Sequence, residues 1–145
     1  MERAPFEYVE GATSDLTFRA YGRGLDELFT AAADATTAAM VDSLDSIGTT
    51  TIRSVSLDAK ELDRLLMAFL DEIVFWKDAD RLLLRATDVH VRWQDGRYEL
   101  RAELHGEQID PAKHRLEADV KAITLHGLRV ERADDGWLAE VTLDV

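Results

Sequence analysis

Two aspartates, one near each end of the chain, are the residues whose positions point to chemistry. Asp144 stands one residue before Val145, directly after an alternating apolar run that predicts a strand. We expect its carboxylate to lie beside the carboxylate that ends the chain. Two negative charges this close repel each other unless a cation, a proton or water screens them. Asp15 follows the small residues Gly11-Ala12-Thr13-Ser14, which are typical of a turn before a strand.

These oxygen donors form a cation site only where the two regions meet in space, which sequence spacing does not show. Oxygen ligands without His or Cys favour Ca²⁺ or Mg²⁺, with Mn²⁺ as a further option. The ordinary alternative is a turn residue at Asp15 and a solvated strand end at Asp144. Our hypothesis is that Asp15, Asp144 and Val145 hold one divalent metal ion, with Ca²⁺ preferred over Mg²⁺ or Mn²⁺.

The four histidines are less informative about chemistry. They are His90, His105, His114 and His126. None forms an i, i+4 pair on a predicted helix or has the spacing of a zinc motif, so surface strand or turn positions explain them. His126 is the exception, because the apolar phase slips at His126-Gly127 and a bulge there would redirect the side chain. With no cysteine and no serine in a nucleophile elbow, nothing supports nucleophilic catalysis.

Two amphipathic helices are predicted to support these residues. Apolar residues recur at helical spacing over residues 25–40. The second helix is predicted to follow Asp58, whose spacing to Glu61 is that of a capping box. Its apolar stripe predicts an end near Trp76 or Lys77.

The remaining pattern indicates strands and tight turns. The predicted strands are residues 16–20 and 49–57 and two hairpins, 89–104 around Asp95-Gly96 and 123–143 around Asp134-Asp135-Gly136. The order strand, helix, strand, helix, then strands predicts an α+β fold with two helices packed on a mostly antiparallel β-sheet. No glycine-rich phosphate loop follows any strand, so the sequence shows no nucleotide-binding motif.

Composition limits the class of protein. A chain of 145 residues with 46% hydrophobic residues predicts one domain spanning residues 1–145. No apolar run has the length of a membrane span, and the first residues lack a secretory pattern, so we expect no membrane partner and a cytoplasmic location. Asp and Glu total 29 against 17 Lys and Arg, for a net charge of −12. So acidic a surface argues against direct nucleic-acid binding.

Several segments together resemble the archease family over nearly the whole chain. They are Ala12-Thr13-Ser14-Asp15, Ala20-Tyr21-Gly22, Leu25-Asp26-Glu27-Leu28-Phe29, Leu65-Leu66, Phe69-Leu70-Asp71-Glu72, Gly106-Glu107, Asp110-Pro111-Ala112-Lys113-His114, Val120-Lys121-Ala122-Ile123-Thr124-Leu125-His126 and Leu143-Asp144-Val145. No segment is decisive alone, whereas their joint order, spacing and end point are fairly specific. The chain departs from the family at Ala12, where a histidine is usual, and at Leu125, where an aromatic residue is common.

The resemblance implies an archease-like fold and an accessory role for an RtcB-type tRNA-splicing RNA ligase. Such a protein promotes loading of guanylate from GTP onto the ligase's active-site histidine and supports multiple turnover without joining RNA itself. The family's metal-binding acidic residues fall at Asp15 and Asp144, with Val145 contributing oxygens. Lys121 matches a lysine of functional importance, which we expect to contact the ligase or to pair with the acidic site. His126, at the predicted bulge, is a second expected contact with the ligase. The implied protein is a non-catalytic activator.

Two functions from other classes remain as alternatives. A small metal-dependent hydrolase, such as a phosphohydrolase, would need a general base or a second metal beside the carboxylates. A generic chaperone-like binding module would expose an apolar patch and accept many partners.

The net charge of −12 generates a prediction about salt. We expect an adaptation to high salt, so the melting temperature should rise by several degrees between about 0.1 M and molar KCl, because ions screen the repulsion between carboxylates. Scanning calorimetry across this range measures it. A melting temperature that is unchanged or falls with KCl identifies an ordinary acidic protein instead.

Overall fold

The computed structural model describes residues 4–9 and 15–145. The small residues before Asp15, including Ala12, lie outside these ranges. The helices are α1 (Leu25–Ala38) and α2 (Leu62–Asp80), with a 3₁₀ turn η1 (Leu44–Ser46). The strands are β1 (Phe6–Val9), β2 (Leu16–Gly22), β3 (Thr51–Ala59), β4 (Leu82–Gln94), β5 (Arg97–Gln108), β6 (Ala122–Ala133) and β7 (Gly136–Asp144).

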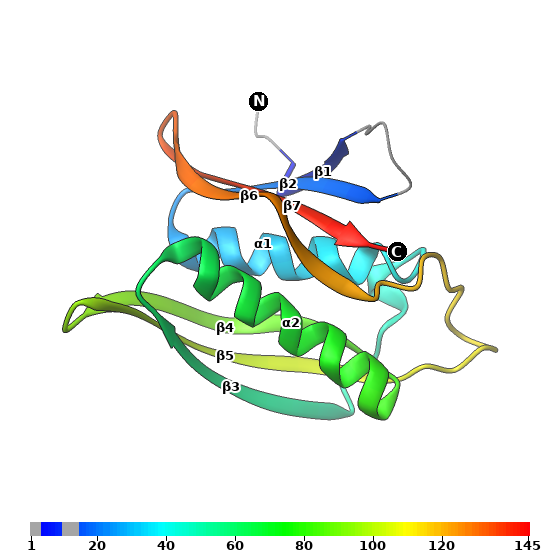
Figure 1. Ribbon diagram of the computed structural model, residues 1–145. Coiled ribbons are helices and arrows are strands. Elements are labelled where there is room, and N and C mark those ends of the chain that lie inside the picture. The colour runs from blue at the N-terminus through cyan, green and yellow to red at the C-terminus, as the bar shows by residue number, and fades with distance from the viewer. Residues whose placement is uncertain (1–3, 10–14) are drawn as a thin grey trace.

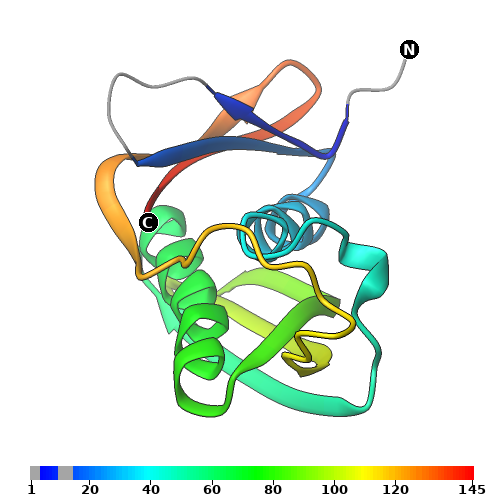
Figure 2. The ribbon, with the colours of Figure 1, turned by 90° about the vertical axis from the view of Figure 1, so that its right-hand side faces the viewer.

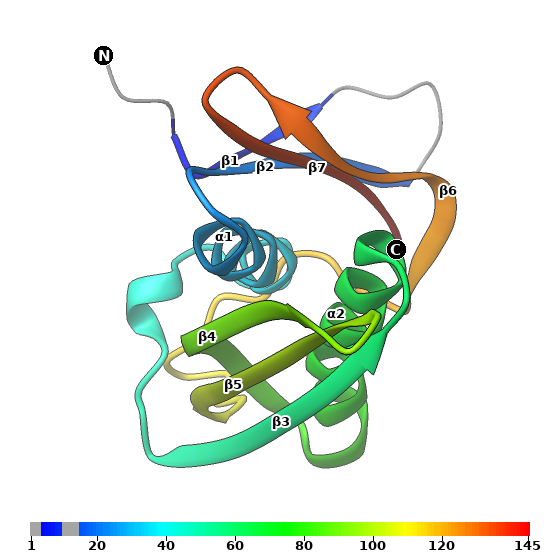
Figure 3. The same cartoon turned by 90° about the vertical axis from the view of Figure 1, so that its left-hand side faces the viewer.

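Two antiparallel sheets enclose the two α-helices (Figure 1). One sheet has the strand order β1-β2-β7-β6 and the other β3-β5-β4. Views from either side show α1 and α2 side by side in the layer between the sheets (Figures 2 and 3). The predicted α+β fold with two helices on antiparallel sheet is confirmed, and the structure adds that sheet covers both sides of the helices.

The helical layer forms the centre of the apolar core. Phe29 of α1 and Phe69 of α2 are both fully buried, and their rings stack with centroids 6.2 Å apart. Gly22 allows the close approach of β2 to the start of α1, because a Cβ at this position would lie 2.4 Å from the Leu28 backbone nitrogen. No described helix combines the length and apolarity needed to cross a membrane.

The predicted ends of α2 are wrong in two respects. Asp58 does not cap the helix, because β3 continues to Ala59 through pairing with β5, and the Asp58 carboxylate accepts a hydrogen bond from Arg97 instead. Glu61 occupies the N-cap position without a side-chain hydrogen bond. The helix also runs past Lys77 to Asp80, where Arg81 ends it in the left-handed conformation with φ 55°.

The strand boundaries differ from the sequence pattern where the alternation breaks. β4 begins at Leu82 rather than near Val89, because a bulge between Thr87 and His90, with Asp88 at φ 51°, reverses the phase of its side chains. β3 lies two residues later than predicted, and the pattern did not predict β1. Both predicted hairpins are confirmed, with turns at residues 95–96 and 134–135.

The layer between the sheets generates a prediction about stability. Replacing Phe69 by Ala should lower the free energy of unfolding by about 3–5 kcal/mol, because it leaves a cavity beside Phe29. F75A is the matched control, since Phe75 is on the same helix but 56% exposed, and it should cost about 1 kcal/mol or less. Urea unfolding measures both values. Equal losses for the two variants would contradict this account of the core.

Candidate functional site

The pairing of β2 with β7 places the start of β2 next to the C-terminal end of the chain. The two strands run antiparallel, and Leu16 is opposite Leu143 in the last pair of the register. Asp15 precedes Leu16 and Asp144 follows Leu143, so each aspartate lies one residue beyond this pair. Positions 15 and 144 therefore lie at the same end of this strand pair.

The outward face of this sheet shows how close such neighbours lie. The Oγ1 atoms of Thr17 and Thr142 are 2.8 Å apart, and Arg19 Nε donates to Glu140 Oε1 at 2.8 Å. Alternation puts position 144 on the same face as Thr142 and Glu140, and position 15 lies in the bend that leads into this end of β2. Two carboxylates at opposing positions repel each other, and a cation held between them removes the repulsion.

Two further predicted residues lie at the same end of the sheet. The Lys121 backbone N–H donates to the Asp144 carbonyl oxygen at 2.8 Å, and the Lys121 side chain is exposed. The Val145 side chain packs against the core, which ties down the end of β7. His126 lies apart from them, exposed in a bulge of β6, roughly 13 Å along the strand from its start. The predicted bulge is confirmed, whereas no contact assigns a role to His126.

The chemistry of this donor set fits a hard divalent cation. Carboxylate and backbone oxygens are the ligands that Ca²⁺ takes, with water completing the coordination. Within residues 4–9 and 15–145, no group of three or more His, Cys, Asp or Glu side chains is placed to hold a metal ion. A metal ion at this end of the sheet would therefore depend on two carboxylates, together with oxygens of Val145 and water.

A residue that sequence reasoning missed holds the neighbouring segment in place. Lys77 of α2 is 9% exposed, and its Nζ donates to the Val120 carbonyl at 2.6 Å and to Asp119 Oδ1 at 2.7 Å. Burial by itself lowers the pKa of Lys77, but hydrogen bonds to Asp119 and Asp78 outweigh it and leave that pKa raised. A signal was present, since a lysine stands where the apolar stripe containing Ile73 predicts an apolar residue.

Comparison with known proteins agrees with this architecture. The chain matches the family model described as Archease protein family (MTH1598/TM1083) over residues 6–145. Protein archease of Methanosarcina acetivorans is 34% identical over 149 residues, covering 97% of this chain and 95% of the relative. Protein archease of Pyrococcus furiosus is 34% identical, with coverage of 92% and 94%.

The chain belongs to the archease family.

Solved structures share the fold. The solution structure of Methanobacterium thermoautotrophicum protein 1598 superposes with a TM-score of 0.84 at 30% identity, covering 97% of this chain and 99% of that one. A crystal structure from Thermotoga maritima, described as an archease and possible chaperone, has a TM-score of 0.63 at 17% identity, covering 100% and 98%. The second likeness bears on the fold alone.

Another of the segments that resemble archeases forms a shielded polar cluster. Glu107 accepts hydrogen bonds from Lys113 Nζ at 2.7 Å and from the Gly48 N–H. The fully buried His114 ring accepts the Asp110 N–H at Nδ1, so its Nε2 carries the proton and faces Glu107 at 3.3 Å. These contacts fasten the segment after β5, which leads toward Lys121.

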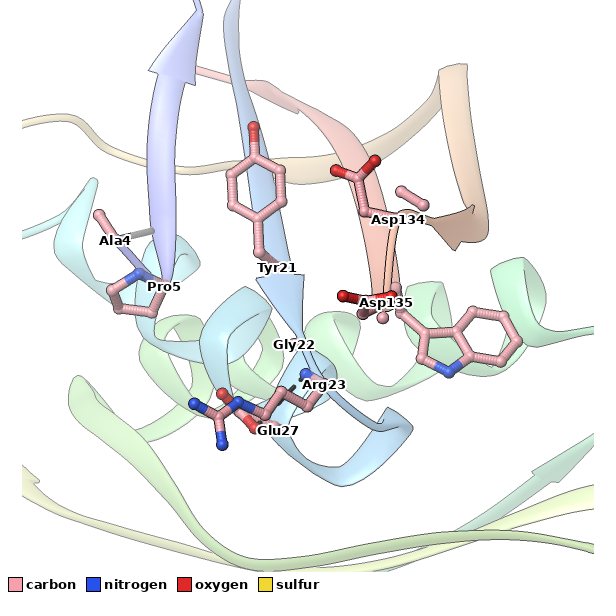
Figure 4. Close-up of a pocket in the computed structure, with 11 residues that line it drawn as sticks. Ala4, Pro5, Tyr21, Gly22, Arg23, Glu27, Asp134 and Asp135 are labelled. Carbon is pink, nitrogen blue, oxygen red and sulfur yellow. Dashed lines mark hydrogen bonds between the residues drawn. The ribbon is translucent and has the colours of Figure 1, made fainter. Parts of the chain in front are cut away.

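A hollow in the described part of the chain lies at the opposite end of the same sheet. Its volume is about 650 Å³, and it contains none of the predicted site residues (Figure 4). Arg23 and Glu27 lie on one side, with Asp134 and Asp135 of the β6–β7 turn on another. Gly22 pairs with Trp137 here, so about 20 Å of strand separates the hollow from the carboxylates. The candidate site is thus a surface at a strand end rather than a deep cleft.

The Glu107 cluster generates a prediction about pH. Hydrogen bonds from Lys113 and the Gly48 N–H lower the pKa of Glu107 from 4.5 to about 2, although burial opposes the shift. Because the folded-state pKa is depressed, its stabilising contribution is present above about pH 4.5 and is lost as the pH falls toward 2. The difference in the free energy of unfolding between wild type and E107Q should therefore shrink over this range.

Urea unfolding from pH 2 to 7 measures this difference. K113M removes the largest cause of the shift, so it should flatten the pH dependence that Glu107 contributes. A difference between wild type and E107Q that stays constant down to pH 2 would contradict the assignment.

Proposed function

We propose that this chain activates an RtcB-type tRNA-splicing RNA ligase through a divalent metal ion held at the end of β2 and β7. The carrying observation is the register of these strands, in which Leu16 pairs with Leu143, so that positions 15 and 144 lie just beyond the same pair. Membership of the archease family supports the choice of ligase, and the oxygen donors support Ca²⁺, with Mg²⁺ or Mn²⁺ as alternatives.

The residues would divide the work as follows. Asp15 and Asp144 bind the cation with their carboxylates, and Val145 adds oxygens while its side chain anchors the strand end in the core. Lys121, exposed beside Asp144, meets the ligase or balances the negative charge of the site. His126, exposed in the β6 bulge, is a second candidate contact. The cation would supply electrostatic stabilisation of phosphate oxygens during guanylate transfer from GTP.

The charge of the protein suits such a partner. A net charge of −12 favours encounter with the basic, RNA-binding mouth of a ligase, because complementary potentials speed association. The same charge opposes contact with RNA, so the accessory protein and RNA would occupy the ligase in turn. In this role the chain acts in the cytoplasm and performs no covalent chemistry of its own.

The distribution of exposed apolar residues does not favour a generic chaperone. In the described part of the chain, the large exposed apolar side chains come from separate segments: Tyr8, Ile52, Phe75, Trp93, Leu116 and Leu125. Apolar residues scattered singly are ordinary on a soluble surface. A metal-dependent hydrolase would be distinguished by turnover of phosphoesters by the purified chain alone.

The proposal generates a prediction about ligase activation. D144A and D15A should each reduce stimulation of ligase guanylylation by at least about 100-fold, because a single carboxylate does not replace the paired donors. D135A is the control, since Asp135 lies at the other end of β7 and is exposed, and it should stimulate fully. Guanylylation is measured with labelled GTP and a divalent metal, with and without each variant.

Thermal unfolding of each variant tests that the fold is retained. Full stimulation by folded D144A would rule out the proposed site.

A further inference from the structure

Among the lysines and arginines that the structure describes, Lys77 alone is buried. It continues the apolar stripe of α2 that contains Leu66, Leu70 and Ile73. A methionine would satisfy this periodicity without the cost of removing a charge from water. The reason for a charged side chain at this position must therefore lie in its hydrogen-bond partners.

Two of the three acceptors of Lys77 belong to the segment that leads into β6. Its Nζ lies 2.7 Å from Asp119 Oδ1 and 2.6 Å from the Val120 carbonyl oxygen, while the third acceptor, Asp78, is its own neighbour on α2. Residues 117–121 have no regular secondary structure. An irregular segment depends on such individual hydrogen bonds for its position.

One peptide group joins Lys77 to the candidate site. The Val120 carbonyl oxygen accepts from Lys77, and the N–H of the same planar peptide, which belongs to Lys121, donates to the Asp144 carbonyl at 2.8 Å. A donor at the oxygen polarises the peptide and strengthens the hydrogen bond that its N–H makes. The side chain of α2 thus acts on the backbone of Asp144 through a single rigid unit.

We propose that Lys77 is a positioning residue, which holds the Val120–Lys121 peptide against β7 and thereby sets the place of Asp144 and Lys121 at the cation site. The inference rests on the proposed function for the role of the cation. The contacts of Lys77 are independent of that role and can be tested separately.

The test measures the site and the segment in the same variants. In K77M, Ca²⁺ affinity by titration calorimetry should fall about 10–100-fold, as is usual when a residue supporting metal ligands is lost. The Lys121 amide should exchange with deuterium at least about tenfold faster, while the Phe18 amide in the middle of β2 keeps its protection. K60M is the matched control, because Lys60 is exposed and lies about 25 Å away at the other end of α2.

A second pair of variants tests the positioning role of Lys77 even if K77M fails to fold. The Asp119 side chain is 74% exposed, so D119A and D119N should both fold. Both remove the same charge, but only the Asn oxygen still accepts from Lys77. D119A should bind Ca²⁺ severalfold more weakly than D119N and exchange the Lys121 amide faster.

The outcomes separate the two claims. Wild type that binds no Ca²⁺ overturns the proposed cation site, and Lys121 exchange then decides the role of Lys77 alone. Equal Ca²⁺ affinity and equal Lys121 exchange in wild type and folded K77M overturn the positioning role. Indistinguishable D119A and D119N overturn it as well.

Discussion

The pairing of β2 with β7 is the contact on which both the architecture and the candidate site depend. It joins the beginning of the chain to its last strand and buries Phe18 and Val141 completely. Because strand side chains alternate, this apolar pairing fixes the register, and a slip of one residue would turn Phe18 to the solvent. The same register brings positions 15 and 144 to the same end of the strand pair. Burial on one face of the sheet thus decides which residues lie near each other at its end.

The irregular segment between β5 and β6 depends on charged side chains in shielded places. Glu107 holds its first part through Lys113 and His114, and Lys77 holds its last part through Asp119 and the Val120 carbonyl. Backbone hydrogen bonds to residues 39–42 hold the middle of the segment, and these side chains secure its two ends. Removing a single partner is costly because it leaves the other polar group buried and unpaired. Together these contacts position Lys121 beside the end of β7.

Much of the fold could be predicted from local pattern, and the errors lie where pairing between strands overrides that pattern. Both helices and both hairpins were expected because their apolar periods and turn residues lie close together in the chain. The Asp58 capping box was wrong because strand pairing across to β5 extends β3 beyond the aspartate. The start of β4 was missed because Asp88, at φ 51°, interrupts the alternation with a bulge. Long-range pairing decided both cases.

For the candidate site, too, some features could be predicted from the sequence and others only from the tertiary structure. Position in the chain and the family resemblance singled out Asp15 and Asp144, and their carboxylates suggested a hard cation because that preference belongs to the side chain wherever it lies. Lys77 could have been recognised as a charge in an apolar stripe. Its acceptors Asp119 and Val120, however, lie more than forty positions further along the chain. Only the tertiary structure brought the strand ends together and linked Lys77 to Asp144 through one peptide. Register and packing set that geometry, because both result from burying apolar surface between segments that are distant in sequence.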